Sequence, residues 1–121
     1  MEKYKSKEFA DARQVVSSSI SKCEKMQPKF MEGTSQHTLL KNRIKALYIS
    51  KALITNEMDL DTYSKVEIIE ALRPIASIIS KCKKAQLKFD ARSSYYTRFE
   101  NLIRAMQLSK ALITEEINKR E

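Results

Sequence analysis

The sequence predicts an all-α protein in which two tandem helical hairpins pack as a pseudo-two-fold four-helix bundle. The first observation behind this prediction is that the 121 residues include one Gly and two Pro, too few turn residues for a sheet of several strands. The second is that apolar residues recur at three- and four-residue steps, the period of an amphipathic helix. The third is that residues 1–59 align without a gap with residues 60–118, with roughly two in five pairs identical.

The duplication predicts how the chain is divided. Ile20–Cys23 returns as Ile79–Cys82, and Ser50–Thr55 returns unaltered as Ser109–Thr114. We expect residues 1–59 to form the first hairpin repeat and residues 60–121 the second, within one compact structural unit. One hairpin leaves its broad apolar face half uncovered, whereas two equivalent hairpins cover each other around a pseudo-two-fold axis. An open two-unit solenoid is the alternative, but such arrays generally need three or more repeats.

The first repeat is expected to form two helices joined by a tight turn. The first helix is expected to extend to Phe30, with Met26 on its apolar face. Gly33 then follows a helix end, and Thr34 and Ser35 are good N-cap residues for the next helix. The residues that place one helix face in the core are Phe9, Ala12, Val16, Ile20, Cys23 and Phe30 in the first helix, and Leu40, Ile44, Ala46, Leu47, Ile49, Leu53 and Ile54 in the second.

The second repeat keeps this plan with apolar replacements, such as Phe99 for Leu40 and Met106 for Leu47. Ser64 followed by Glu67 fits a capping box at the start of its first helix. Pro74 lies well inside the same periodic run, where it removes an amide and is expected to kink the helix or to split it after Arg73. The short polar segment 55–61 joins the two repeats.

The chain lacks the residues that most catalytic and cofactor-binding sites need. His37 is alone, and a single Gly excludes a glycine-rich phosphate loop. Cys23, Cys82 and this one histidine provide too few ligands for an ordinary four-ligand zinc site. We therefore expect the two cysteines to be reduced core residues. The sequence predicts a protein that is not an enzyme and has no metal or cofactor.

The chain also lacks signals for export or membrane insertion. Its first residues are polar and charged, and no uninterrupted apolar stretch approaches the ~20 residues that span a bilayer. We therefore expect a soluble, cytoplasmic protein with no membrane partner.

Two phrases of the first repeat resemble a family of short, uncharacterised bacterial proteins that carry a single copy of this helical hairpin. They are Ile20–Lys25 and Thr34–Leu47. The resemblance would cover both repeats, and the second departs from it most at Tyr95, Tyr96, Arg98, Glu100 and Leu102. It implies a helical hairpin and brings no activity, catalytic residue or ligand.

The polar residues kept in both repeats are the candidate contact residues, because packing does not explain their repetition. Three lysines repeat along one face of the first helix of each hairpin, and each set would approach the amides at the start of the following helix, which bind anions. The alternative interpretation is a solvated lysine face beside a capping serine. The candidates for anion or partner contact from this comparison are Lys22, Lys25, Lys29 and Ser35, and Lys81, Lys84, Lys88 and Ser94, and Arg98 is added from the second repeat alone.

The formal net charge of +8 divides evenly between the repeats, which favours a field over the whole molecule rather than a basic tail. We expect a non-enzymatic interaction or regulatory module that binds an unidentified acidic protein. The alternative is phosphate-directed binding of nucleic acid or a nucleotide through the lysine faces. Tyr95 and Tyr96 could stack on bases near Arg92 and Arg98, although one ring packed in the bundle and one at its rim is the simpler interpretation. The chain would be a monomeric fused pseudo-dimer or a weak homodimer.

Overall fold

A computed structural model describes residues 6–56 and 62–120 of the chain, and within these ranges it contains helices and no strands. The all-α prediction is therefore confirmed. The elements in chain order are α1 (Ser6–Met26), the short 3₁₀ helix η1 (Gln27–Lys29), α2 (Ser35–Thr55), α3 (Lys65–Gln86) and α4 (Ser94–Lys119).

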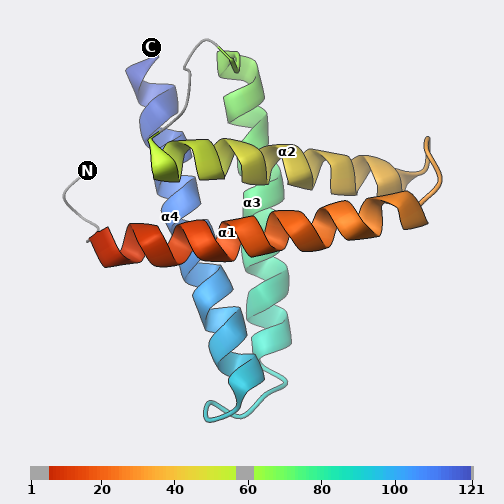
Figure 1. The fold of residues 1–121 in the computed structure, drawn as a ribbon, viewed down its shortest axis with the longest axis vertical. Coiled ribbons are helices and arrows are strands. Elements are labelled where there is room, and N and C mark those ends of the chain that lie inside the picture. The colour runs from red at the N-terminus through yellow and green to blue at the C-terminus, as the bar shows by residue number, and fades with distance from the viewer. Residues whose placement is uncertain (1–5, 57–61, 121) are drawn as a thin grey trace.

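The four helices form two layers. Helices α1 and α2 make one hairpin, and this hairpin lies across the hairpin of α3 and α4 (Figure 1). Between the layers, α1 packs on α4, α2 packs on α3, and α2 also packs on α4. Exchanging the two hairpins leaves this set of contacts unchanged, as expected for a pseudo-two-fold bundle. The tips of the two hairpins point to different ends of the molecule (Figure 1).

The core is built from equivalent positions of the two repeats. Ala12 and Ala71 are both buried, and so are Cys23 and Cys82. Burial raises the pKa of both thiols, and the nearby Arg43 guanidinium opposes this rise in each of them. Both cysteines are free, as the sequence predicts. The equivalent pairs that are buried in both repeats are Ala12 and Ala71, Val16 and Ile75, Cys23 and Cys82, Ala46 and Ala105, Leu47 and Met106, Ile49 and Leu108, Ser50 and Ser109, and Ile54 and Ile113.

Helices α2 and α4 contact each other, and each carries one copy of the longest run that the two repeats share, Ser50–Thr55 and Ser109–Thr114. The carboxyl-terminal half of α2 lies across α4 (Figure 1). Ser50 and Ser109 are fully buried, and each hydroxyl donates to a carbonyl one turn earlier, Ala46 at 2.9 Å and Ala105 at 2.8 Å. Because each serine satisfies its hydroxyl within its own helix, two polar side chains are buried in the core without an unpaired group.

Two helix boundaries differ from the simplest interpretation of the periodicity. The first helix ends at Met26 rather than Phe30, because Pro28 cannot donate a backbone hydrogen bond and the chain continues as η1. Helix α3 continues through Pro74 up to Gln86, so the proline does not split it.

The expected capping box is present, since Ser64 accepts from the Glu67 amide and Glu67 accepts from the Ser64 amide. Residues 57–61, where the repeats join, lie outside the described residues.

Candidate functional site

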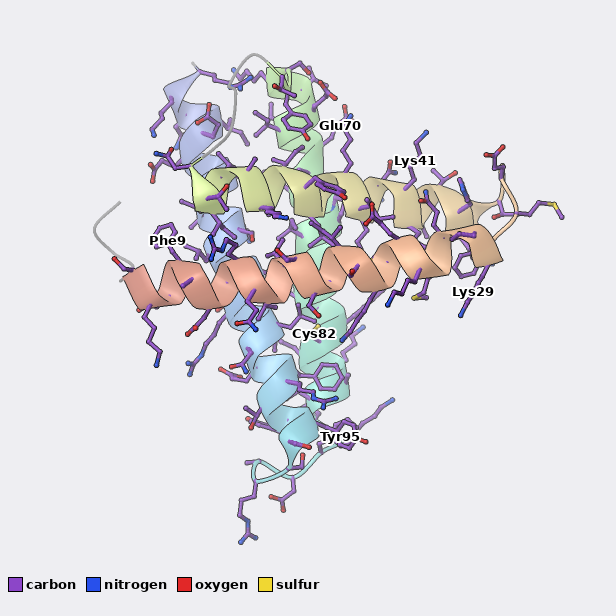
Figure 2. All side chains as sticks on the ribbon, viewed as in Figure 1. Phe9, Lys29, Lys41, Glu70, Cys82 and Tyr95 are labelled. Carbon is purple, nitrogen blue, oxygen red and sulfur yellow. The ribbon has the colours of Figure 1, made fainter. Side chains whose placement is uncertain are left out.

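The six candidate lysines are exposed, and three of them lie along each hairpin on the side of its tip. In the first hairpin, Lys22 and Lys25 lie on α1 and Lys29 closes η1. Figure 2 shows Lys29 close to the tip of that hairpin. In the second hairpin, Lys81 and Lys84 lie on α3, and Lys88 follows its end. The structure thus places the two lysine sets on different hairpins, pointing to different ends of the molecule.

The serines that the sequence suggests as caps lie one residue inside the helices. Helix α2 is capped by Thr34, whose hydroxyl accepts from the His37 amide at 3.2 Å. Helix α4 is capped by Ser93, which accepts from the Tyr96 amide at 3.1 Å. Of the two cap residues that the sequence offers, Thr34 and Ser35, the structure uses Thr34, so the capping residue beside the lysines is not Ser35. Ser35 and Ser94 are exposed first residues of their helices, and one amide near each is already occupied by the cap.

The hairpin tips also expose large apolar side chains. We define the first tip as residues 24–39 and the second tip as the equivalent residues 83–98. Met31 is 78% exposed and Leu39 66% at the first tip, and Leu87 is 86% exposed and Tyr95 55% at the second. Met26 and Phe89 are exposed there as well. Large apolar groups gathered on a surface are typical of interaction sites.

Charge distinguishes the two tips. The second tip holds five basic residues and one acidic residue, a net charge of +4, whereas the first tip holds two of each and is neutral. The difference comes mainly from Lys83, Arg92 and Arg98, whose counterparts are Glu24, Gly33 and Leu39. The even division of charge between whole repeats thus conceals an uneven division between their tips.

The second tip has an ordered aromatic surface. The Phe89 ring stacks on Tyr95 with centroids 5.1 Å apart and on Phe99 at 5.9 Å. The Arg98 guanidinium lies 5.9 Å from the Tyr95 ring centroid, within the range of a cation–π contact. Figure 2 shows Tyr95 near the turn that joins α3 to α4. Tyr95 thus lies at the rim of the bundle, and Tyr96 is partly buried, as in the simpler of the two sequence interpretations.

A hydrogen-bonded glutamine holds the start of α4 against the end of α3. The Gln86 side-chain amide donates to Glu100 Oε1 at 2.9 Å and to the Tyr96 carbonyl at 3.2 Å. In the turn itself, the Arg92 amide donates to Asp90 Oδ1 at 2.8 Å. Arg92 Nε also forms an ion pair with Asp90 Oδ1 at 3.5 Å, and the Arg92 side chain is 93% exposed. The basic and aromatic groups therefore lie beside a turn that is hydrogen-bonded at both the helix ends and its own loop.

A groove of about 1100 Å³ extends from the second tip along the contact of α1 with α4. Tyr95 and Arg98 belong to both the second tip and the groove lining, and Phe99 follows them in the lining. From there the lining follows α4 to Leu108 and α1 from Lys22 back to Lys7. The groove and the second tip thus form one continuous surface.

The sequence points to part of this surface and misses the rest. Lys22, Lys84, Lys88, Ser94 and Arg98 belong to the second tip or the groove, and the others lie elsewhere on the molecule. Leu87 and Phe89 were not singled out, because Leu87 follows the end of α3 and Phe89 is the counterpart of Phe30, which the periodicity assigns to the core. Comparing charge between equivalent segments, rather than between whole repeats, is the signal that would have found the second tip.

Among the residues that the structure describes, no group of three or more His, Cys, Asp or Glu side chains could hold a metal ion. No helix within the same ranges has both the length and the apolar character to span a membrane. No family model, curated protein or solved structure matches the chain.

Proposed function

We propose that this protein is a non-enzymatic interaction module whose second tip binds an acidic segment of a partner protein. The observation that supports this proposal most directly is the pairing of exposed apolar side chains with a net charge of +4 at residues 83–98. Apolar contacts would supply affinity, and the basic side chains would select and steer an acidic partner. The first tip is a natural internal comparison, because it exposes apolar groups without the charge.

Selection from a random peptide display library tests the proposal, because it does not require the partner to be identified first. Peptides enriched on the immobilised protein are expected to be acidic and to carry several large apolar residues. Their affinity should fall about ten-fold in the Lys83→Glu, Arg92→Gly variant, because three units of charge are lost and each surface contact contributes roughly 0.5 kcal/mol. Both replacements are the residues of the first repeat, Glu24 and Gly33, so the fold should tolerate them.

The matched control is Lys41→Ala with Lys110→Glu, which removes the same charge from exposed positions outside the second tip. Peptide affinity in this control should stay within two-fold of the original. Failure to enrich acidic peptides, or equal weakening by the control variant, would contradict the proposal, because the location of the charge would then not matter.

Nucleic acid is the second candidate partner, and the stacked aromatic residues of the second tip are the observation that favours it. Bases stack on exposed aromatic rings in proteins that bind single strands. Phe89 and Arg98 already contact the Tyr95 ring, however, so a base would have to replace part of those contacts. Single-stranded DNA titrated across a salt series separates the candidates. Phosphate-directed binding weakens steeply with salt as counterions are released, whereas apolar peptide contacts persist.

A further inference from the structure

We infer that the α1–α4 groove is the docking site for an acidic amphipathic helix of the partner protein. This inference rests on the proposed function, because the groove begins at the second tip. It specifies that the bound segment of the partner is helical, and it adds the groove as a second contact surface. The duplication provides the internal comparison that supports it.

The groove has an apolar floor and a polar rim. Every buried or partly buried residue of the lining is apolar except Ser19, and every exposed one is polar or charged except Tyr95. The floor consists of Ala12, Val15 and Ser19 from α1 and Phe99, Leu102, Ala105 and Leu108 from α4. A groove with an apolar floor and a polar rim matches the apolar stripe and the polar flanks of an amphipathic helix.

The equivalent contact, between α2 and α3, carries different side chains. The pseudo-two-fold relation makes the α2–α3 contact the counterpart of the α1–α4 contact. There Ile78, the counterpart of Ser19, is buried, and Lys45 of α2 forms an ion pair with Glu67 of α3. Their counterparts Arg104 and Glu8 both line the groove, and Arg104 pairs instead with Glu100 of its own helix at 3.4 Å. The groove therefore lies where the counterpart of the Lys45–Glu67 ion pair is missing and where Ser19 takes the place of an isoleucine.

The charge of the rim selects the occupant. Lys7, Lys22, Arg98 and Arg104 line the groove against Glu8 and Asp11, a net charge of +2. A second copy of this chain, which carries +8, would be repelled from it. An acidic segment is attracted, and the adjoining second tip extends the same positive field.

The apolar floor favours a helix over an extended peptide. An extended segment would place backbone N–H and C=O groups over a floor whose one polar side chain, Ser19, already donates its hydroxyl to the Val15 carbonyl at 3.0 Å, whereas a helix satisfies these groups internally. The lining of α4 from Tyr95 to Leu108 spans about 20 Å at the helical rise of ~1.5 Å per residue, the length of a helix of about 14 residues.

The probe is a fluorescein-labelled 16-residue peptide with leucines at helical spacing and Glu or Asp at the remaining positions, measured by fluorescence anisotropy. The control peptide has the same composition with its leucines rearranged so that no helical stripe remains. The first peptide should bind at least ten-fold more tightly than the second. Equal binding of the two would overturn the helix assignment.

The decisive variant is Ser19→Ile, which fills the floor with the residue that the second repeat carries at this position. It should weaken binding of the amphipathic peptide at least ten-fold. Ser21→Ile places the same side chain on an exposed position of α1 outside the groove and should leave binding unchanged. If Ser19→Ile fails to fold, as judged by circular dichroism, Leu102→Arg replaces it, because Arg43 occupies the equivalent position.

The two proposals fail in different ways. If Ser19→Ile and Leu102→Arg bind the peptide normally while Lys83→Glu, Arg92→Gly does not, the second tip binds acidic segments and the groove assignment is overturned. If neither peptide binds the original protein and no acidic peptide is enriched from the library, both proposals are overturned.

Discussion

Glu116 is the one buried carboxylate among the described residues, and it ties the end of α4 to the start of the second repeat. Its side chain accepts from Arg120 Nε at 3.0 Å, and Arg120 Nη1 donates to the Tyr63 carbonyl at 2.7 Å. Tyr63 directly precedes the Ser64 cap of α3, so this pair connects two helix ends. The sequence does not single out Glu116, because an acidic residue in a polar run carries no mark of burial.

Replacing Arg120 with alanine is expected to lower the free energy of unfolding by about 2 kcal/mol, because Glu116 would stay buried without its charged partner. Urea unfolding followed by circular dichroism at neutral pH measures the change. The matched control is Lys119→Ala, which removes an exposed partner of Glu115 and should cost less than about 0.5 kcal/mol. Equal stability of the two variants would show that the Arg120 pair contributes nothing particular.

At the scale of the helices, the amino-terminal end of α3 combines a capping box with an ion pair to α2. Lys45 and the Ser64 amide both bind the Glu67 carboxylate, with Lys45 the larger influence, and they lower its pKa to about 2. The ionised carboxylate is thus favoured by the fold. Its contribution to stability is present above pH 4.5, the ordinary pKa, and is lost as the pH falls toward 2.

The Glu67→Gln variant should therefore be less stable than the original protein at pH 6, with a difference that shrinks between pH 4.5 and 2. Urea midpoints measured across this range test the prediction. Lys45→Met should show the same dependence on pH, because it removes the main cause of the shift. A difference between Glu67→Gln and the original protein that stays constant down to pH 2 would contradict the assignment.

Pro74 lies inside α3 at the position that Val15 occupies in α1. A proline in a helix interior costs about 3 kcal/mol relative to alanine, through its missing amide and its contact with the preceding turn. Pro74→Val should raise the free energy of unfolding by about 1–2 kcal/mol, since valine recovers the amide but has a lower helix propensity than alanine. Thermal unfolding followed by circular dichroism measures the change in stability. A loss of stability would mean that the packing around α3 requires the proline.

The helices and their buried faces were predictable, because apolar periodicity reports directly which side of a helix packs. Their ends were less predictable. Pro28 ends α1 four residues before Phe30, although the periodic pattern continues past it. The choice of Thr34 over Ser35 as the cap depends on backbone angles, and two adjacent capping residues in the sequence do not distinguish between them.

At the scale of the whole molecule, the duplication explains why the core is symmetric. The pseudo-two-fold axis relates α2 to α4, and each of these two helices carries one copy of the shared run, Ser50–Thr55 and Ser109–Thr114. The sequence predicted the bundle and its pseudo-symmetry. It did not predict that one hairpin lies across the other, because amphipathic stripes specify which faces meet and not the angle at which they cross.

The surfaces of the two repeats differ where their cores agree. Copy-to-copy identity pointed to the shared lysines, but the groove and the charge of the second tip arise from positions that differ, such as Ser19 against Ile78 and Lys83 against Glu24. Identity between the copies reports the common fold. The differences between them report the surface that we propose for the partner.

Nuclear magnetic resonance of the ¹⁵N-labelled protein, titrated with an acidic amphipathic peptide, tests the central claim most directly because it locates the binding surface. The account predicts chemical-shift changes in residues 83–98 and in the groove residues of α1 and α4, with the amides of residues 24–39 unchanged. Equal changes at both tips, or changes confined to residues 24–39, would show that the charge of the second tip does not select the partner.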